Sequence, residues 1–354
     1  MHIPALDKRV TIPQMARQLG LHHATVSRAL RNHPEIAGET KRRVRELAAQ
    51  LGYRPDPYLT GLAAYRQAGR EAGFAGTLAW ITNWPTRGGW RENPVFPQHF
   101  RGAGVRAQEQ GYRLEEFWLR EPGMDARRVL RIAEARGIQG LLFAAQSRPH
   151  VRLDMDLSRF SAVTFGHTLE SPVLHGVTNH HYQTMIALLK RLHSLGYRRP
   201  GIFRLQPLED RVNRVWTAAF WAYASDYGRR GDTIPPLVVP RLRRNLFLEW
   251  EARYRPDVII ASNVETVRRW LEAAGRKIPE DIGLVPPIMS DNGGGFFSGM
   301  DENGAVIGAA AVDLLVSMIH RNERGVPVHP QRLLIEGSCA WVEGRSVRKL
   351  QAHG

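Results

Sequence analysis

Three short helical patterns within residues 10–52 constrain the fold of this chain more than any other feature. The first begins with the capping box "TIPQ" at Thr11, places apolar residues at helical spacing and ends at Gly20. The short stretch "GLH" separates it from a second helix predicted over Ala24–Leu30, and a third is predicted over Glu39–Leu51. Two helices joined by a tight turn and braced by a third are typical of the helix-turn-helix, a DNA-binding motif.

The distribution of charge supports a polyanionic partner for this segment. The chain has a formal net charge of +15 over 354 residues. Residues 1–70 hold twelve Lys and Arg against five Asp and Glu, so they carry nearly half of the net charge in a fifth of the length. Nucleic acid is the simplest polyanion that such a segment would bind.

Cysteine usage and hydropathy indicate the compartment. The single cysteine, Cys339, has no partner for an intrachain disulfide, so nothing indicates an oxidising environment. The N-terminal residues "MHIPALDKRVTIPQ" lack the apolar core of a signal peptide, and no uninterrupted apolar run approaches the ~20 residues of a membrane span. We therefore expect a soluble, cytoplasmic protein without a membrane association.

From residue 75 onward, strand and helix patterns alternate. Predicted strands include "GTLAWIT", "RLEEFWL", "GLLFAA", "SAVTFGH", "PGIFRL", "PDVIIAS" and "IGLVPPI". Predicted helices include "PQHFRGAGVRAQEQGY", "DARRVLRIAEARG", "YQTMIALLKRLHSLGY", "VWTAAFWAYASDYG", "VETVRRWLEAAG" and "AVIGAAAVDLLVSMIH". Alternation of this kind predicts an α/β fold with parallel sheets covered on both faces, and some 280 residues suit two doubly wound subdomains.

The chain is thus expected to have three parts. Residues 1–56 form the helix-turn-helix domain, and residues 57–74 form a short helix and a linker. Residues 75–350 form the two-lobed α/β domain.

The N-terminal motif resembles the DNA-binding segment of the LacI family of bacterial transcription regulators. The resemblance rests on Val10-Thr11-Ile12, on Ala24-Thr25-Val26-Ser27-Arg28, on Glu39-Thr40 and on Leu51-Gly52-Tyr53-Arg54-Pro55, over about 50 contiguous residues. Weaker matches follow in "HFRGAGVRAQEQGY", "LKRLHSLGYRRPGIF" and "KIPEDIGLV". The resemblance implies a periplasmic-binding-protein-like effector domain and a homodimer on a near-palindromic operator in double-stranded DNA.

The resemblance also implies residue roles, which the side-chain chemistry supports. The second helix would enter the major groove, with base edges faced by His23, Ala24 and Arg28. Backbone phosphates would be contacted by Thr11, Thr25, Ser27, Thr40 and Arg54. His22 stands where the family usually has a serine cap, and a phosphate contact or a role at the helix start is expected for it. Leu62 falls where the family's hinge helix inserts a leucine into the minor groove, although the surrounding "PYLTGLAAYRQ" departs from the family pattern.

A small effector would bind between the subdomains, at the carboxyl ends of the strands. Trp84, Trp90 and Phe96 follow the first strand and would form an aromatic wall. Arg211 and Arg214 follow "GIFRLQPL", where the family often has a ligand-binding arginine.

The effector pocket also departs from the family pattern. The usual Asn-Asp pair is Asn263-Val264 here, with Glu265 next, and the family's Arg-Gln is absent near Met300-Asp301-Glu302. We expect the effector site in the family's location with altered chemistry. A sugar remains the favoured ligand because aromatic faces and polar forks suit it.

Other interpretations of the same residues are weaker. A metal site at His22 and His23 is disfavoured because adjacent helical residues do not face one site. "HGVTNHH" matches no metal motif and is predicted as a loop, and "SDNGGGFFSG" lacks the lysine of a phosphate loop. Without a catalytic motif or a cofactor motif, we expect a regulator and not an enzyme. The alternatives are a periplasmic-type solute-binding protein and an α/β enzyme with an appended DNA-binding module.

Overall fold

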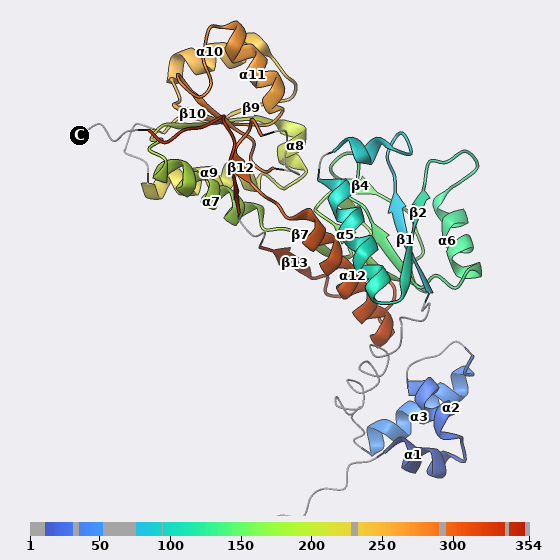
Figure 1. Ribbon diagram of the computed structural model, residues 1–354. Coiled ribbons are helices and arrows are strands. Elements are labelled where there is room, and N and C mark those ends of the chain that lie inside the picture. Colours follow the sequence, from blue (N-terminus) through green and yellow to red (C-terminus); the bar gives the residue numbers. More distant parts are fainter. Residues whose placement is uncertain are drawn as a thin grey trace, which may run out of the picture. The chain divides into compact units, whose positions relative to one another are not determined.

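The computed structural model describes residues 11–30, 35–51, 76–93, 95–227, 233–289, 295–336 and 340–350 (Figure 1). The chain divides into two compact units, residues 1–75 with 317–323 and residues 76–316 with 324–354, and each is taken by itself below. Arg54, Leu62 and the helix predicted within 57–74 lie outside the described residues.

The described residues of the N-terminal unit form the helices α1 (Ile12–Leu19), α2 (His23–Leu30) and α3 (Gly38–Gln50), each within two residues of its predicted bounds. One apolar cluster holds them together, with Met15, Ala16, Val26, Ala29 and Val44 buried at its centre. These positions are the inward-facing stripe of each helix, so the periodicity of the sequence predicted this core.

The turn between α1 and α2 depends on local chemistry at both ends of α1. The backbone N–H of Thr11 donates to Gln14 Oε1 at 2.8 Å, which forms the glutamine half of the capping box. At the other end Gly20 has a φ of 65°, a left-handed conformation that disfavours a residue with a Cβ. The glycine therefore lets the chain turn sharply into the next helix.

The first sheet of the α/β unit has six parallel strands in the order β13-β7-β5-β3-β1-β2. These strands are β1 (Gly76–Thr82), β2 (Tyr112–Trp118), β3 (Gly140–Phe143), β5 (Ser161–Phe165), β7 (His175–Asn179) and β13 (Arg332–Ile335). One face packs on α6 (Ala126–Ala135) through residues such as Ile81. On the other face Trp80 contacts Phe100 of α5 (Phe96–Glu109) at 5.2 Å between ring centroids. The sheet is therefore covered on both faces.

The second sheet has four parallel strands in the order β11-β10-β8-β9. They are β8 (Pro200–Leu205), β9 (Leu237–Val239), β10 (Val258–Ala261) and β11 (Gly283–Val285). One face is covered by α7 (His181–Ser194) and α9 (Val215–Tyr227), and the other by α10 (Arg244–Tyr254) and α11 (Val264–Ala273). The prediction of two doubly wound subdomains is confirmed.

The chain crosses between the two subdomains three times. It leaves the first sheet after β7, returns through α12 (Gly304–Arg321) and crosses again after β13. The last crossing leads to β14 (Trp341–Val342), which pairs antiparallel with β12 (Gly299–Met300). Shorter elements complete the fold: η1 (Gly89–Glu92), β4 (Val151–Arg152), β6 (Leu169–Ser171) and α8 (Gln206–Asp210).

Helix α12 is long and apolar enough to cross a membrane by length and composition. Its contacts are those of a core helix, because Ile307, Ala311 and Leu315 are fully buried. Gly308 lies so close to the backbone of His99 in α5 that a Cβ would overlap with the carbonyl oxygen of that residue. The apolar composition of α12 is therefore explained by its packing within the α/β unit.

One sequence prediction fails in this unit, and some elements were not predicted. "HGVTN" was expected to be a loop but is the buried strand β7, because it is hydrogen-bonded between β5 and β13. Its histidines and polar residues gave no strand pattern. Strand β9 and helix α10 were also not predicted, and the apolar stripe of α10 is interrupted by charges.

Candidate functional site

Helix α2 begins at a histidine cap. The backbone N–H of Ala24 donates to His22 Nδ1 at 3.3 Å, and Thr25 N–H donates to the His22 carbonyl at 2.9 Å. An imidazole nitrogen thus accepts from the first turn of the helix, which is the role of a serine or aspartate cap. His22 thus takes the place of the family's usual serine cap, and an N–H group at the start of α2 still has a side-chain acceptor.

The face of α2 opposite its core is open to solvent. His23 and Arg28 are exposed, and Val26 is buried in the core. The remaining candidate DNA contacts of this helix are half-buried: Ala24, Thr25 and Ser27. Arg28 Nη1 lies 3.5 Å from Glu35 Oε2, with both side chains more than half exposed. An ion pair of this kind is weak in water, so the Arg28 guanidinium can exchange Glu35 for another acceptor.

Thr11 and Thr40 lie at the starts of α1 and α3, where a hydroxyl can reach an anion. Thr11 is exposed and Thr40 is half-buried. Along α3, Arg43 and Arg45 are exposed, while Arg42 is held by Glu39 at 2.7 Å and by Glu46 at 3.0 Å. The unit therefore presents positive charge on more than one helix.

The α/β unit contains a cavity of about 890 Å³ between its two sheets. Segments that follow six parallel strands line it, three from each sheet. These segments supply Asn93 and Phe96 after β1, Gly166–Thr168 after β5, His181 after β7, Arg211 after β8, Ser262–Thr266 after β10 and Pro286–Met289 after β11. The cavity lies at the carboxyl ends of the strands, where ligands bind in open α/β sheets.

A buried ion pair forms part of the wall from β8 and α8. Arg204 Nε donates to Glu209 Oε1 at 2.6 Å, and their side chains are 4% and 1% exposed. Thr217 Oγ1 also donates to Glu209, at 2.7 Å. Burial lowers the pKa of Arg204, and the Glu209 carboxylate partly restores it. Arg204 therefore faces the cavity as a cation that is already neutralised.

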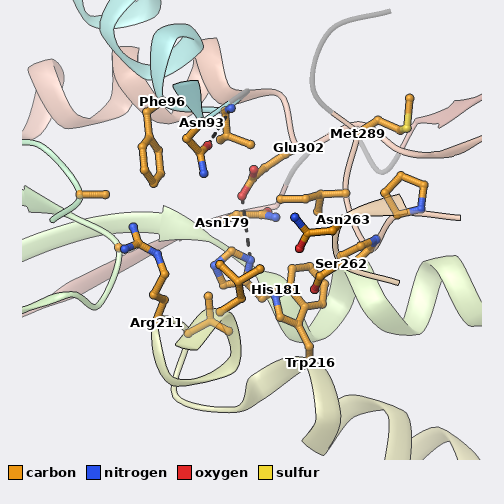
Figure 2. A pocket seen from close by; sticks show the side chains of 18 of the residues that line it. Asn93, Phe96, Asn179, His181, Arg211, Trp216, Ser262, Asn263, Met289 and Glu302 are labelled. Carbon is orange, nitrogen blue, oxygen red and sulfur yellow. Dashed lines mark hydrogen bonds and ion pairs between the residues drawn. The ribbon is translucent and has the colours of Figure 1, made fainter. Parts of the chain in front are cut away.

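Arg211 contributes a guanidinium that pairs with no carboxylate among the described residues. Its Nη1 donates to the Gln146 carbonyl at 2.7 Å, and its guanidinium lies 5.5 Å from the centroid of the Phe96 ring. Burial lowers the pKa of Arg211 to about 10, so the side chain stays charged at neutral pH. In Figure 2, Arg211 extends along the wall toward Phe96.

Glu302 enters the cavity from the segment between β12 and α12, facing Asn179 and His181 (Figure 2). It is 4% exposed, and its Oε1 lies 3.9 Å from His181 Nδ1. Burial raises the pKa of Glu302 to about 7. The Asn179 amide lowers this pKa in part, and the negative charge of Asp301 raises it slightly. Burial likewise lowers the pKa of His181 to about 3, so the imidazole stays neutral beside the carboxyl.

Several buried polar atoms of the lining lack a partner among the described residues. They are Asn179 Oδ1, His181 Nδ1, His99 Nε2, Ser262 Oγ and Glu302 Oε2. Unpartnered buried polar groups are costly and uncommon, so their concentration around one cavity indicates a ligand that pairs with them. The described residues contain no group of three His, Cys, Asp or Glu side chains that could hold a metal ion.

Comparison with known proteins identifies the N-terminal unit. Residues 11–56 match the model of the bacterial regulatory proteins of the lacI family. The N-terminal unit is therefore a helix-turn-helix domain of the LacI-family type. Among curated relatives, the transcriptional regulator MalR of Streptococcus pneumoniae is 26% identical over 177 residues. That match covers 49% of this chain and 50% of MalR, so the chain spans about half the length of this relative.

Solved structures share the fold of nearly the whole chain. The complex of the transcriptional regulator CelR with cellobiose has a TM-score of 0.54 at 18% identity, covering 96% of this chain and 100% of CelR. The lac repressor dimer bound to operator and the anti-inducer ONPF has a TM-score of 0.54 at 14% identity, covering 96% and 99%. At these identities the comparison establishes the LacI-type architecture of a helix-turn-helix followed by two α/β subdomains.

The structure brings together four of the seven expected effector residues. Phe96, Arg211, Asn263 and Glu265 line the cavity. Asn263 has a φ of 54°, a left-handed conformation that is uncommon outside glycine and that occurs at functional sites. Its side chain makes no cap hydrogen bond with α11.

The expected aromatic wall is not formed, because the two tryptophans lie outside the lining. Trp90 is 1% exposed in the core, where its Nε1 donates to Glu116 at 2.8 Å. Trp84 donates to the Ala145 carbonyl at 2.9 Å, and its ring lies edge-on to the Phe96 ring at 6.0 Å between centroids. Arg214 is also outside the lining; it is 69% exposed and pairs with Asp210.

Sequence reasoning missed most of the buried polar lining, namely His99, Asn179, His181, Arg204 and Glu302. Position after a strand end was the available signal for His181, but the strand before it was not predicted. A second signal for Glu302 was the absence of the family's usual Arg-Gln near Met300-Asp301-Glu302.

Proposed function

We propose that this chain is a ligand-responsive transcriptional regulator that represses carbohydrate-utilisation genes in the cytoplasm. The observation that carries the proposal is the presence, in one chain with a LacI-family helix-turn-helix, of an exposed helix α2 and a cavity lined in part by buried polar side chains. The first suits a groove of DNA, and the second suits a small polar molecule.

On DNA, α2 reads the major groove. Arg28 can pair with the O6 and N7 atoms of guanine, His23 can donate to a base acceptor and Ala24 can contact a thymine methyl. Phosphates are contacted by Thr11, Thr25, Ser27, Thr40 and Arg54, and by His22 at the start of the helix. Leu62 of each subunit enters the minor groove, so the protein acts as a homodimer on a near-palindromic operator.

The effector is a sugar or a close chemical relative. A cavity of about 890 Å³ has room for a molecule of disaccharide size. Phe96 offers an apolar face, and Arg211 and Asn263 offer polar groups beside it. CelR, which shares this architecture, was solved with cellobiose.

Regulation follows from the lining of the cavity by both subdomains. A ligand that bridges the two sheets favours one arrangement of the subdomains over the other. Such a ligand shifts DNA affinity only if it binds the DNA-competent and DNA-incompetent states unequally.

The proposal is tested by a gel shift of purified full-length protein on genomic fragments, with and without a panel of sugars and sugar derivatives. We expect selective retention of a few fragments and a change in that retention with at least one compound. Absence of any selective retention contradicts DNA regulation. Retention that no compound changes contradicts the effector role of the cavity.

Two other classes share parts of this architecture. A periplasmic-type solute-binding protein would use the same two-lobed core, and an enzyme would place chemistry in the cavity. The LacI-family helix-turn-helix at residues 11–56 disfavours the first. The second would require turnover of a bound compound, which product analysis in the same experiment detects.

A further inference from the structure

Glu302 is the residue of the cavity whose chemistry the proposed function leaves unexplained. Its carboxyl is 4% exposed, faces the cavity and has an oxygen, Oε2, without a hydrogen-bond partner among the described residues. The Asn179 amide interacts with this carboxyl but carries no charge. A buried carboxylate that no cation neutralises is one of the costliest groups that a protein can contain. A glutamine would fill the same space and supply both a donor and an acceptor. What only glutamate adds is negative charge.

Within the part of the chain that the structure describes, no positively charged side chain neutralises the Glu302 carboxylate. The nearest basic group is His181, at 3.9 Å, and its imidazole is too deeply buried to hold a proton near neutral pH. Arg204 is committed to Glu209 at 2.6 Å. Arg211 donates to the Gln146 carbonyl and lies against Phe96.

Neighbouring acidic residues strengthen the negative potential around this position. Asp301 adjoins Glu302 and raises the energy of its ionised form. Glu92 and Glu265, both exposed, also line the cavity. A ligand cation would therefore be attracted to the cavity and would find a buried counter-charge inside it.

We propose that the effector carries a protonated amino group that binds Glu302, while its hydroxyl or carbonyl oxygens accept from Arg211. The ligand class is an amino sugar or a similar polyhydroxylated amine. This inference rests on the proposed function of the cavity and specifies its chemistry. Binding of the ammonium to Glu302 gives a buried charge-assisted hydrogen bond, which neutral sugars cannot form.

The test uses full-length protein and matched probe sets: glucosamine, galactosamine and mannosamine, their parent hydroxyl sugars, their N-acetyl derivatives and the corresponding uronic acids. Thermal-shift and calorimetric titrations are made at pH 6 and pH 8. A hydrogen bond between charged groups in a buried site predicts about a tenfold or larger preference for one amino sugar over its parent. The preference should grow from pH 6 to pH 8, as Glu302 ionises.

The variant Glu302→Gln should lose this preference and its pH dependence while remaining folded. Glu249→Gln is the matched control, because Glu249 is exposed on α10 and lies outside the cavity lining. It should behave as the wild type does.

The inference is overturned if the amino sugars do not bind, if the neutral or acidic counterparts bind equally well, or if Glu302→Gln retains the preference. Selective DNA retention by the same preparation separates these outcomes from failure of the regulator proposal. If DNA retention persists and the amine preference is absent, only the ligand class is wrong.

Discussion

Arg204 Nε and Glu209 Oε1 lie 2.6 Å apart at a buried wall of the cavity, with almost no solvent contact on either side. Both charges have lost their hydration, so each depends on the other and on the Thr217 hydroxyl that also donates to Glu209. Removal of one partner leaves an uncompensated charge in a medium that solvates it poorly.

Glu209→Ala should therefore destabilise the protein by about 3–5 kcal/mol, the usual cost of breaking a buried ion pair. The measurement is equilibrium unfolding in urea. Glu170→Ala is the control, because Glu170 pairs with Arg152 at the same distance of 2.6 Å on the surface. That exposed pair should contribute less than about 1 kcal/mol. Equal losses in the two variants would contradict the burial argument.

Glu302 should make stability depend on pH in a defined window. Burial raises its pKa from 4.5 to about 7, so the folded state favours the protonated acid. Its contribution to stability is fully present below pH 4.5 and is lost as the pH rises through 7. Glu302→Gln should match the wild type near pH 4.5 and be more stable by on the order of 2–3 kcal/mol at pH 8.

The measurement is the free energy of unfolding of both proteins between pH 4.5 and pH 8.5. A constant difference across this range would show that Glu302 has an ordinary pKa. A variant that becomes less stable at high pH would mean that the carboxylate is stabilised by a group that the described residues do not include.

The close approach of α5 and α12 predicts opposite effects for two glycine substitutions. A Cβ at Gly308 would overlap with the His99 carbonyl, so Gly308→Ala should cost about 1–3 kcal/mol or more from overpacking. A Cβ at Gly104 of α5 meets nothing within 4 Å. Gly104→Ala should be neutral or add about 0.5–1 kcal/mol, since alanine is the better helix former. Thermal unfolding of both variants checks the sign; a tolerated Gly308→Ala would contradict the helix contact.

Arg28 is expected to supply sequence specificity and not general affinity. Arg28→Ala should lower the preference for operator over scrambled DNA by about 1–3 kcal/mol, the value of one bidentate base contact. Arg241→Ala removes the same charge from an exposed position in the α/β unit and should leave the preference unchanged. Fluorescence anisotropy at constant salt measures both. Equal losses on the two DNAs would assign Arg28 to the phosphates.

The sequence was most predictive where local chemistry determines structure. The capping box at Thr11, the left-handed turn at Gly20 and the apolar stripe through Met15 and Val26 correctly located the three N-terminal helices. The alternation of strands and helices also predicted two doubly wound subdomains, because that pattern depends on burial of whole segments.

The cavity lining was harder to predict, because its residues are selected by tertiary contacts. Trp90 and Phe96 both follow β1 and have similar local signals, but Trp90 packs into the core and Phe96 faces the cavity. Strand β7 was not predicted because its buried residues His175 and Asn179 are polar and fit no apolar pattern. His181 follows this strand, so it was not predicted as a cavity residue either. Glu302 reaches the cavity from a position more than a hundred residues beyond Asn179, which no local pattern reveals.

The most direct test of the central claim, sequence-specific DNA binding by this chain, is an anisotropy titration of the wild-type protein. Genomic fragments enriched by the protein supply the operator, and a scrambled duplex of equal length is the reference at the same salt concentration. Specific regulators prefer their sites by about 10³-fold or more, and we predict a preference of that order. Equal affinity for the two duplexes, with a shared dependence on salt, would contradict the claim.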